Sequence, residues 1–361
     1  MIKKEYKDFS SRFHELHASE PIVVQIELTY KCPLRCVHCY SDCYNNPTFR
    51  KKERSTKSMK KIIDKLYKAK CLWLCFTGGD PMTRRDFIEL YIYARKKGFL
   101  VTIFTSLAAL NDKILSTLVL HPPFSIEMTL NGATKETYEK ISQVKGSFDK
   151  VMKNIRRVMD AKLPLKIKTL LSKDNIHEEK KIRRLVNSFG MNFLASTLIF
   201  AGLDQDTTPC EHRLSAEEII KLEGVYDEEE CAHAGNTNVN NLFRCPAGTW
   251  QYYIDPLGRL HLCSCIRDPN YGVLNGDIME GVRVLSAFVK NHKFQTESKC
   301  KDCVYWQACH WCTGKAFLET GKWEEPIPYF CELAQKQTQH EPVQPTRSTI
   351  GRPRRLDKGN G

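Results

Sequence analysis

Four cysteines fall within twelve residues near the start of the chain, in the stretch TYKCPLRCVHCYSDC at 29–43. Cys32, Cys36 and Cys39 have the spacing C-x3-C-x2-C, and Cys43 follows. Three thiolates on one short loop can hold three irons of a cubane iron–sulfur cluster and leave the fourth iron open to a small molecule. A structural zinc ion needs four tight ligands, and Cys43 could be the fourth, but zinc sites normally pair two knuckles across a longer gap. The spacing therefore favours a cluster that excludes Cys43.

A glycine-rich turn follows the next apolar stretch, in CLWLCFTGGDP at 71–81. Gly78 and Gly79 allow close approach of the backbone to another group, or positive φ. Taken alone, Gly-Gly-Asp-Pro indicates a tight turn, but its place after a predicted strand and downstream of the cysteine loop favours a binding loop. Polar residues at later strand ends are weaker candidates, because a satisfied strand-end polar group is an equal alternative; they are Thr105, Ser106, Thr129, Asn131 and Lys168.

A second cysteine array lies toward the C-terminus. It contains Cys245, a Gly258-x4-Cys263 pair, a C-x2-C-x5-C-x2-C run over 300–312, and Cys331. Zinc ribbons also use two C-x2-C knuckles, but a dozen or more residues commonly separate them. Only five residues separate the knuckles here, which suits a compact cluster loop better. In closely spaced runs one cysteine can ligate a different cluster.

The elements that must position these residues alternate along the chain. Apolar, β-rich segments alternate with segments of helical periodicity. The predicted strands are 21–29, 71–77, 99–105, 124–130, 163–171 and 191–200, and the predicted helices are 57–69, 86–98, 111–120, 147–161 and 176–190. This pattern predicts an α/β fold in which a parallel sheet curls into a partial (β/α)6 TIM-like barrel, open on one side. Chemistry in such sheets sits at the C-terminal strand ends, where both the cysteine loop and the glycine turn fall.

Composition divides the chain into five predicted parts. Residues 1–20 are a polar lead-in, 21–205 the barrel, 206–244 a polar linker, 245–335 a small Cys-rich domain held together by metal rather than by a large apolar core, and 336–361 a disordered basic tail. Four cysteines belong to neither array. Cys71 and Cys75 are expected in the strand core, and for Cys210 and Cys231 surface thiols are favoured over substrate-side groups.

The formal charge of +13 lies mostly on predicted amphipathic helices. Solvated helix faces explain it better than a nucleic-acid surface, so no nucleic acid is expected, although an acidic peptide or protein would be attracted. No apolar run is long enough to span a membrane, and the Lys-rich start leads into no signal-peptide core. We therefore expect a cytoplasmic protein without membrane partners, in which sixteen cysteines favour metal or redox chemistry over disulfides.

The first cysteine loop resembles that of the radical S-adenosylmethionine (SAM) superfamily. The resemblance implies a [4Fe–4S] cluster on Cys32, Cys36 and Cys39 whose open iron binds the amine and carboxylate of SAM. One electron would then cleave SAM to a 5′-deoxyadenosyl radical. The glycine turn is similar to the family's Gly-Gly-Glu-Pro motif, with aspartate replacing glutamate. By resemblance, the SAM-binding residues are His38, in place of the usual aromatic residue near adenine, with Tyr40, Gly78, Gly79, Asp80, Pro81, Ser106 and Thr129.

The second array resembles the SPASM domain, which carries auxiliary clusters in radical enzymes that modify peptides and proteins. The resemblance implies two further [4Fe–4S] clusters. Carried over by position, the outer cluster would use Cys300, Cys303, Cys309 and Cys331. The inner cluster would use Cys245, Cys263 and Cys312, with Cys265 as a candidate fourth ligand and an open position as the alternative.

Together these resemblances predict a maturase of a ribosomally made peptide that forms a thioether or a C–C or C–O cross-link. The alternatives are a sulfatase-type formylglycine maturase, a peptide epimerase, a tetrapyrrole or quinone cofactor maturase, and a non-catalytic electron-transfer protein. The expected partners are a precursor peptide and an electron donor such as flavodoxin or ferredoxin. Because only about twenty residues precede the first strand, we expect either a separate leader-binding protein or direct recognition of the peptide by the barrel and SPASM surface. No catalytic acid or base stands out.

Overall fold

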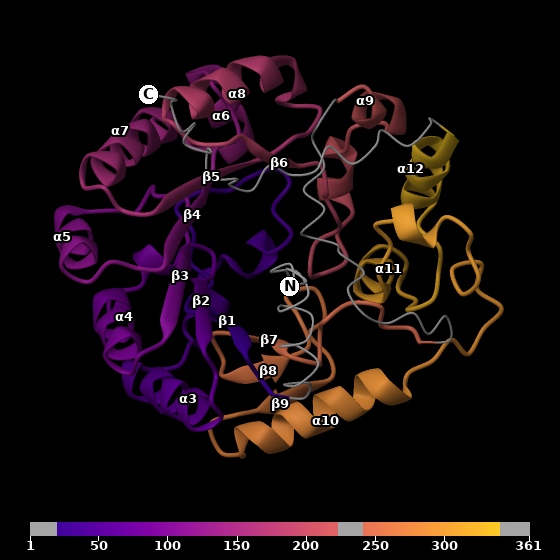
Figure 1. Ribbon diagram of the computed structural model, residues 1–361, viewed down its shortest axis with the longest axis horizontal. Helices are drawn as coiled ribbons and strands as arrows, with labels where there is room; N and C mark the ends of the chain where they lie inside the picture. The colour runs from indigo at the N-terminus through magenta and orange to yellow at the C-terminus, as the bar shows by residue number, and fades with distance from the viewer. Residues whose placement is uncertain (1–19, 223–240, 340–361) are drawn as a thin grey trace, which may run out of the picture.

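The computed structural model of the chain describes residues 20–222 and 241–339 (Figure 1). Its sheet contains the six predicted strands, β1 (Val23–Glu27), β2 (Trp73–Thr77), β3 (Leu100–Phe104), β4 (Ser125–Thr129), β5 (Leu165–Leu170) and β6 (Leu194–Ser196). They lie in the order β6-β5-β4-β3-β2-β1, and every neighbouring pair is parallel. The predicted α/β fold with a partial barrel is confirmed.

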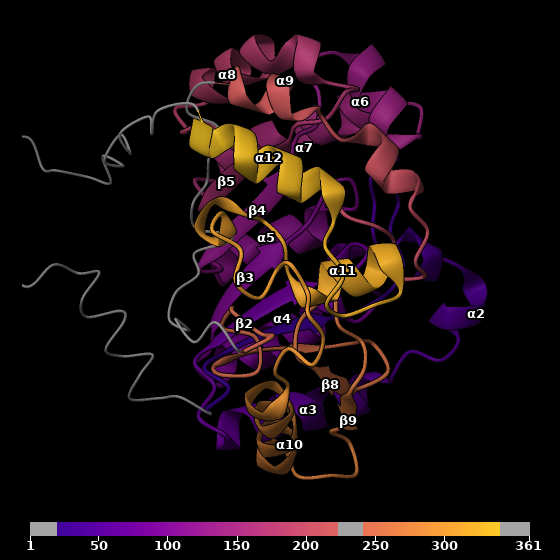
Figure 2. The ribbon, with the colours of Figure 1, turned by 90° about the vertical axis from the view of Figure 1, so that its right-hand side faces the viewer.

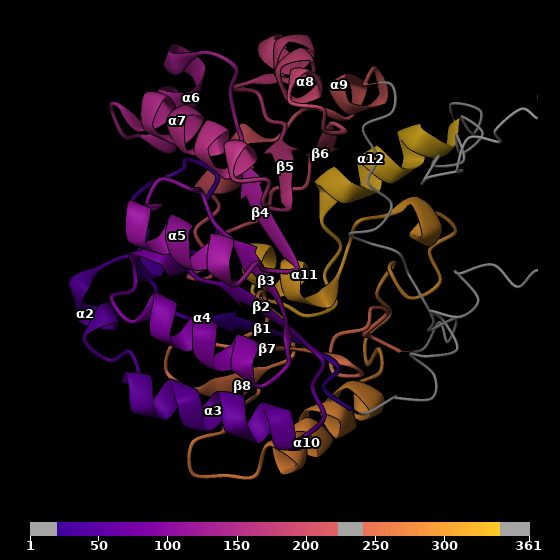
Figure 3. The same ribbon diagram turned by 60° about the vertical axis from the view of Figure 1, so that its left-hand side comes forward.

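Helices cover the outer, convex side of this curved sheet (Figure 3). The five predicted helices are α3 (Thr56–Lys68), α4 (Phe87–Lys96), α5 (Asp112–Leu120), α7 (Ser147–Asp160) and α8 (Glu179–Ser188), the last preceded by the short helix η3 (Ile176–Glu178). The chain also forms α2 (Pro47–Arg50) and α6 (Lys135–Ser142), which were not predicted. Helix α6 begins where the Thr134 hydroxyl accepts a hydrogen bond from the Thr137 amide, a short capping signal that the sequence pattern did not distinguish from loop.

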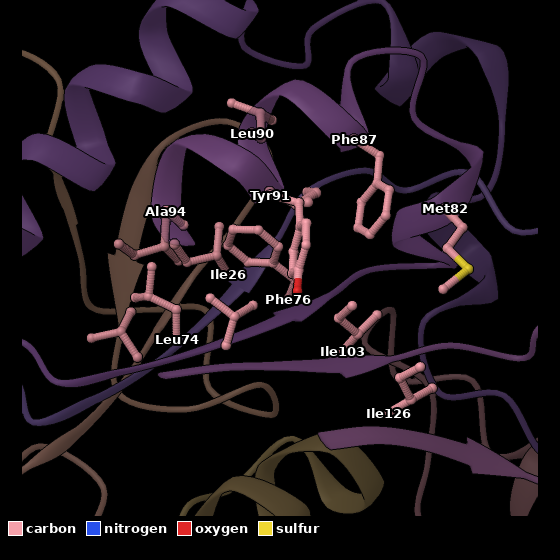
Figure 4. Packing of buried hydrophobic residues seen from close by; sticks show 14 of the residues in the cluster. Ile26, Leu74, Phe76, Met82, Phe87, Leu90, Tyr91, Ala94, Ile103 and Ile126 are labelled. Carbon is pink, nitrogen blue, oxygen red and sulfur yellow. The ribbon is translucent and has the colours of Figure 1, made fainter. Parts of the chain in front are cut away.

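The main hydrophobic core lies between the sheet and these helices. Ile26, Phe76 and Ile103, which project from the outer face of the strands, pack with Phe87 and Tyr91 of α4 (Figure 4). All five side chains are at most 1% exposed. Because successive strand residues point to opposite faces, this packing turns the polar neighbours of the core residues toward the inside of the barrel. The inner face is therefore available for a site.

The C-terminal region continues the same sheet. Strand β7 (Gln251–Ile254) pairs in parallel with β1, and β8 (Arg259–His261) and β9 (Asn270–Gly272) follow in antiparallel order. Helix α10 (Ile278–Asn291) packs its buried side onto the same hydrophobic core as the barrel. The expectation that this region lacks a large apolar core is therefore wrong for its first part, because alternating residues such as Tyr252, Ile254 and Leu260 extend the barrel core.

The cysteine-rich segment and the connecting region complete the inner side of the arc, where α9, α11 and α12 face the strands (Figures 1 and 2). Before this segment lie η4 (Thr208–His212) and α9 (Ala216–Ile220); within and after it lie η5 (Trp306–Ala308), α11 (Thr313–Thr320) and α12 (Pro328–Gln339). Helix α12 extends past residue 335, so the predicted tail begins inside a helix rather than after it. The predicted lead-in through residue 19, residues 223–240 of the linker with Cys231, and the tail from residue 340 lie outside the described residues.

Within 20–222 and 241–339, none of the helices is both long enough and apolar enough to cross a membrane.

Candidate functional site

A cavity of about 440 Å³ lies inside the barrel at the C-terminal ends of its strands. This volume is in the usual range for small-molecule sites. Most of the residues predicted to bind SAM or the first cluster form part of its wall: Cys36, His38, Cys39, Tyr40, Gly78, Gly79, Ser106 and Thr129. Three of the predicted residues do not line the cavity, namely Cys32, Asp80 and Pro81.

Two side chains outside the cysteine motif fix the cysteine loop. Asn45 is buried; its Oδ1 accepts a hydrogen bond from the Cys32 amide at 3.2 Å, and its Nδ2 donates to the Cys32 carbonyl at 3.3 Å. Glu53 accepts from the Thr29 hydroxyl at 2.9 Å and from the Tyr30 amide at 2.8 Å. These contacts join residues 13 to 24 positions apart in the sequence, so no short sequence pattern predicted them.

The three predicted ligand thiols are close neighbours in a partly buried environment. Burial raises the pKa of Cys36 to about 12, and the thiols of Cys32 and Cys39 are also shifted upward, first by burial. Cys32 lies behind the cavity wall but close enough to Cys36 and Cys39 for their charges to raise its pKa further. Such thiols stay protonated until a metal displaces the proton, so metal binding here releases protons.

In the described part of the chain, no three His, Cys, Asp or Glu side chains converge closely enough to hold a single metal ion. A tetrahedral zinc site requires such convergence. Cys43 does not line the cavity itself, but it packs in a small apolar cluster with Tyr40 and Phe200, which do. Burial first, and then the charges of Asp204 and Cys39, raise its pKa, so Cys43 lies near the motif thiols.

The glycine turn packs directly against the cysteine loop. A Cβ on Gly78 would lie 2.5 Å from the Thr29 carbonyl oxygen, and one on Gly79 would lie 2.6 Å from the Lys31 carbonyl. The Gly79 amide donates to the Thr29 carbonyl at 2.8 Å, and the Asp80 amide donates to the Lys31 carbonyl at 2.8 Å. The close backbone approach that these glycines permit is thus to the cysteine loop, while both residues also line the cavity.

Asp80 is fully buried, and hydrogen bonds within the protein occupy its carboxylate. The carboxylate accepts from the Met82 amide, from the Thr105 hydroxyl at 2.9 Å, and from Ser106 through both its amide at 2.9 Å and its hydroxyl at 2.5 Å. Direct contact of this carboxylate with a SAM amine was expected, but the arrangement does not favour it. Asp80 instead joins the ends of β2 and β3. Pro81 is likewise buried behind the wall, at the start of η2 (Pro81–Thr83).

His38 presents an unpaired polar atom next to the cavity. The Asn131 amide nitrogen lies 3.4 Å from Nε2 of His38, and an amide NH2 group can only donate, so Nε2 is the acceptor. The proton then resides on Nδ1, which is buried and has no hydrogen-bond partner. Burial first, and then the charge of His212, lower the pKa of His38 to about 4, so the ring is neutral at pH 7. A buried N–H donor without an acceptor suits recognition of a ligand nitrogen or oxygen.

The other predicted residues lie around the same cavity. The ring of Tyr40 packs against Phe200 with centroids 4.9 Å apart, and burial raises its pKa. Thr129 ends β4 and is exposed to the cavity. Sequence reasoning missed Glu127, which lies two residues before Thr129 and therefore on the same inner face of β4. The alternation of side chains between the two faces of a strand was the sequence signal that could have identified Glu127.

The outer cysteine set comes together around a second cavity. Its volume is about 1,200 Å³, and the predicted ligands Cys300, Cys303, Cys309 and Cys331 all line it. Their thiols are close enough that the charges of the other three raise the pKa of Cys300, which burial raises to about 12. The run of cysteines 300–309 and the distant Cys331 are therefore positioned to share one group.

The inner set lies between this cavity and the barrel. The charges of Cys245 and Cys263 act on Cys312, whose pKa burial raises to about 11, and Cys263 lies next to Cys265. Gly314, two residues after Cys312, lets α11 approach this loop, since a Cβ there would lie 2.7 Å from Cγ1 of Ile266, the residue after Cys265. Cys265 is therefore next to Cys263 and near the start of α11.

Three further described cysteines, Cys71, Cys75 and Cys210, are not among the predicted ligands of either array. Cys71 and Cys75 are each 5% exposed within the sheet, as expected of core thiols. Cys210 is half-buried in the small apolar cluster that also contains Cys43, and burial raises its pKa to about 11. It is therefore less exposed than the predicted surface thiol.

Comparison with known proteins gives this geometry a family context. Residues 26–186 match the radical SAM superfamily. The chain contains a radical SAM domain. This domain covers the cysteine loop, the glycine turn and most of the barrel, and relatives with the same domain are enzymes.

Relatives of the radical SAM protein include peptide and cofactor maturases. It is 24% identical over 305 residues to the mycofactocin maturase MftC of Mycobacterium tuberculosis, covering 80% of this chain and 77% of the relative. It is 24% identical over 339 residues to the AdoMet-dependent heme synthase of Nitratidesulfovibrio vulgaris, covering 83% and 90%. Its fold is similar to that of SuiB from Streptococcus suis bound to the precursor peptide SuiA, with a TM-score of 0.65, 14% identity, and coverage of 90% and 80%.

The cofactors of a radical SAM domain are one [4Fe–4S] cluster and SAM, and the residues present fit both. Three clustered thiols without a fourth side-chain ligand suit a cluster with one open iron. The unpaired Nδ1 of His38 and the polar wall beside it suit the nucleoside of SAM. The radical SAM protein is accordingly an enzyme, and the cavity inside the barrel is its candidate site.

Proposed function

We propose that this protein is a radical SAM peptide maturase. It would cleave SAM reductively, use the resulting 5′-deoxyadenosyl radical to remove a hydrogen atom from a ribosomally made peptide, and form a thioether or a C–C or C–O cross-link. The observation that carries the proposal is the common cavity, in which two thiols of the radical SAM motif, the His38 donor and a charged inner wall face one another. The similarity to the mycofactocin maturase MftC over most of the chain, and to the PqqA peptide cyclase of Rhodopseudomonas palustris over 160 residues at 26% identity, supports a peptide substrate.

We assign the first cluster to Cys32, Cys36 and Cys39, and two auxiliary clusters to the outer and inner cysteine sets. The charge effects among the thiols of the outer and inner sets support this assignment, and the closeness of Cys265 to Cys263 supports it as the fourth inner ligand. We also assign the barrel to 21–205, the linker to 206–244 and the SPASM domain to 245–335. The N-terminal lead-in and the basic tail complete this division.

The first cluster would supply the electron that breaks the sulfur–C5′ bond of SAM. The chain itself orients the reactants: His38 would donate to the adenine base, and the cavity wall would exclude water from the radical. Hydrogen transfer from the peptide to the 5′-carbon leaves a peptide radical. Bond formation to a second group then releases one proton and one electron, which an auxiliary cluster would accept, so the peptide loses two hydrogens in all.

The partners follow from this chemistry. We propose a precursor peptide as substrate, a cytoplasmic electron donor such as flavodoxin or ferredoxin, and a separate protein that binds the peptide leader. The net charge of +13 would favour acidic partners of this kind.

The proposal is tested with anaerobically reconstituted protein, SAM, a reductant and the short peptides encoded beside the gene. We expect 5′-deoxyadenosine and a peptide that is lighter by two hydrogens. Solvent deuterium in a peptide of otherwise unchanged composition would indicate an epimerase instead. Absence of 5′-deoxyadenosine would contradict the catalytic assignment.

A second candidate is a tetrapyrrole maturase. The coverage of the heme synthase relative, 90% of its length, is the observation that favours it. Oxidation of a tetrapyrrole rather than a peptide under the same conditions would decide for this alternative.

A further inference from the structure

A charged group projects from β4 and β5 into the barrel. Glu127 lies between two lysines of the neighbouring strand, because β4 and β5 are parallel and Glu127 is in register with Lys166. Its Oε2 is 2.8 Å from the ammonium nitrogen of Lys168, and its Oε1 is 3.7 Å from that of Lys166. The Lys168 ammonium also lies 5.4 Å from the centroid of the Phe104 ring on β3. Lys168 is thus held in place from two sides.

This group carries one excess positive charge next to the cavity. Glu127 and Lys168 both line the cavity, and Lys166 lies below them toward the N-terminal ends of the strands. Glu127 is the only carboxylate on the described wall. The half-buried ammonium group of Lys168 has lost part of its hydration, and contact with an anion compensates for that loss. The wall therefore suits a ligand that brings a carboxylate.

Both SAM and the peptide substrate carry a carboxylate, and the position of Glu127 and Lys168 in the barrel distinguishes between them. The residues that match the SAM amine motif lie at the end of β2, whereas Glu127 and Lys168 lie on β4 and β5. Both are also two residues below the strand ends, deeper in the barrel than Thr129 and Leu170. A carboxylate at this depth belongs to the second reactant.

We propose that Lys168, oriented by Glu127 and Phe104 and supported by Lys166, is a carboxylate-binding subsite for the peptide substrate. It binds an acidic side chain, or the C-terminal carboxylate, close to the residue from which hydrogen is removed. The substrate class is therefore an acidic peptide at the reacting segment. This inference rests on the proposed function for the identity of the substrate, but its test does not depend on turnover.

The test uses three synthetic probes on cluster-loaded protein with SAM, without reductant. The probes are acetyl-GADYAG-amide, its neutral counterpart acetyl-GANYAG-amide, and acetyl-GANYAG with a free C-terminal carboxylate. Isothermal titration calorimetry gives their affinities. We expect at least one acidic probe to bind about tenfold more tightly than the neutral probe, the effect of one charge-assisted hydrogen bond.

Variants assign that preference to the subsite. Lys168→Met should remove it, and Lys168→Arg, which keeps the charge, should retain it. Glu127→Gln should increase it, because Lys168 then loses its internal anion. The matched control is Lys153→Met on the outer, exposed side of α7, which removes the same charge and should leave all three affinities unchanged. If Glu127 and Lys168 had a purely structural role, Lys168→Met and Glu127→Gln would not change the preference for acidic probes in opposite directions.

Equal affinity of the three probes for the wild-type protein, including no binding by any, would overturn the subsite. So would a preference that persists in Lys168→Met. Weaker SAM binding by Lys168→Met with an unchanged probe preference would assign the lysine to the SAM carboxylate instead. A Lys168-dependent preference in a protein that oxidises no peptide would keep the subsite and refute the proposed function.

Discussion

At the scale of single residues, the reactive groups are held by side chains that have no chemistry of their own. Asn45 fixes the backbone of Cys32, and Asp80 fixes Ser106 on the cavity wall. The motif cysteines were predictable because their spacing is specific. Asn45 and Glu53 were not predictable, because their partners are defined by the folded loop alone.

The cysteine motif predicts different effects for the replacement of two nearby cysteines, Cys39 and Cys43. Cys39→Ala should abolish SAM cleavage, because it removes one of three ligands. Cys43→Ala should leave cleavage intact, because the C-x3-C-x2-C motif supplies three ligands without it and the fourth iron must stay open for SAM. The measurement is 5′-deoxyadenosine formed by anaerobic, reduced protein, together with iron content. Loss of cleavage in Cys43→Ala at normal iron content would contradict the assignment.

Asp80 should support SAM binding by holding Ser106 in place on the cavity wall rather than by contacting SAM. Asp80→Ala leaves the Thr105 and Ser106 donors buried without an acceptor. Each buried unsatisfied polar group costs about 1–3 kcal/mol, so the melting temperature should fall by several degrees. SAM affinity should fall with it. Glu89→Ala, in an exposed pair on α4, is the control and should change neither quantity. An unchanged melting temperature with lost SAM affinity would favour direct contact instead.

At the scale of elements, the strands carry residues of the cavity wall, and contacts between the loops that follow them position the cysteine loop. The alternation of strand and helix predicted all six barrel strands and their main helices, because each has a clear apolar period. Glu127 was missed because an isolated polar residue inside a strand reads as a surface position. Only the sheet curvature turns that face into a cavity wall.

The glycine turn should tolerate no side chain where it meets the cysteine loop. A Cβ at Gly79 would lie 2.6 Å from backbone atoms of Lys31, which cannot move without displacing Cys32. Gly79→Ala should therefore lower the iron content after reconstitution and the affinity for SAM. Gly272→Ala on β9 meets nothing within 4 Å and is the matched control. Normal iron content and SAM affinity in Gly79→Ala would show that the close approach is dispensable.

At the scale of the whole molecule, the C-terminal region completes the barrel rather than standing beside it. Strand β7 extends the sheet from β1, and α10 shares the main core. Composition could not predict this continuity, because β7 to β9 are short and surrounded by cysteine, glycine and proline residues. The resemblance to the SPASM domain nevertheless predicted four cysteines of the outer set that line one cavity.

One buried ion pair joins the linker to both flanking regions. Arg213 donates to the Ile199 carbonyl at 2.8 Å and forms two hydrogen bonds with Glu319 of α11, at 3.0 and 2.5 Å. Its guanidinium also lies over the ring of Tyr329 on α12. Arg213→Met leaves Glu319 buried and unpaired and should cost about 3–5 kcal/mol.

Thermal unfolding of the anaerobic protein checks this cost. The double variant Arg213→Met/Glu319→Leu should recover much of the loss, because both charges are then removed. Equal melting temperatures for the single variant and the wild type would contradict the role of this pair.

The central claim is that the barrel generates a radical that acts on a peptide. The most direct measurement follows deuterium from a peptide with deuterated side chains and α-carbons into 5′-deoxyadenosine, in reduced, cluster-loaded protein. Candidate peptides are sought among short reading frames beside the gene. We expect one deuterium in 5′-deoxyadenosine for each peptide that loses two hydrogens. Formation of unlabelled 5′-deoxyadenosine with an unchanged peptide would contradict the account.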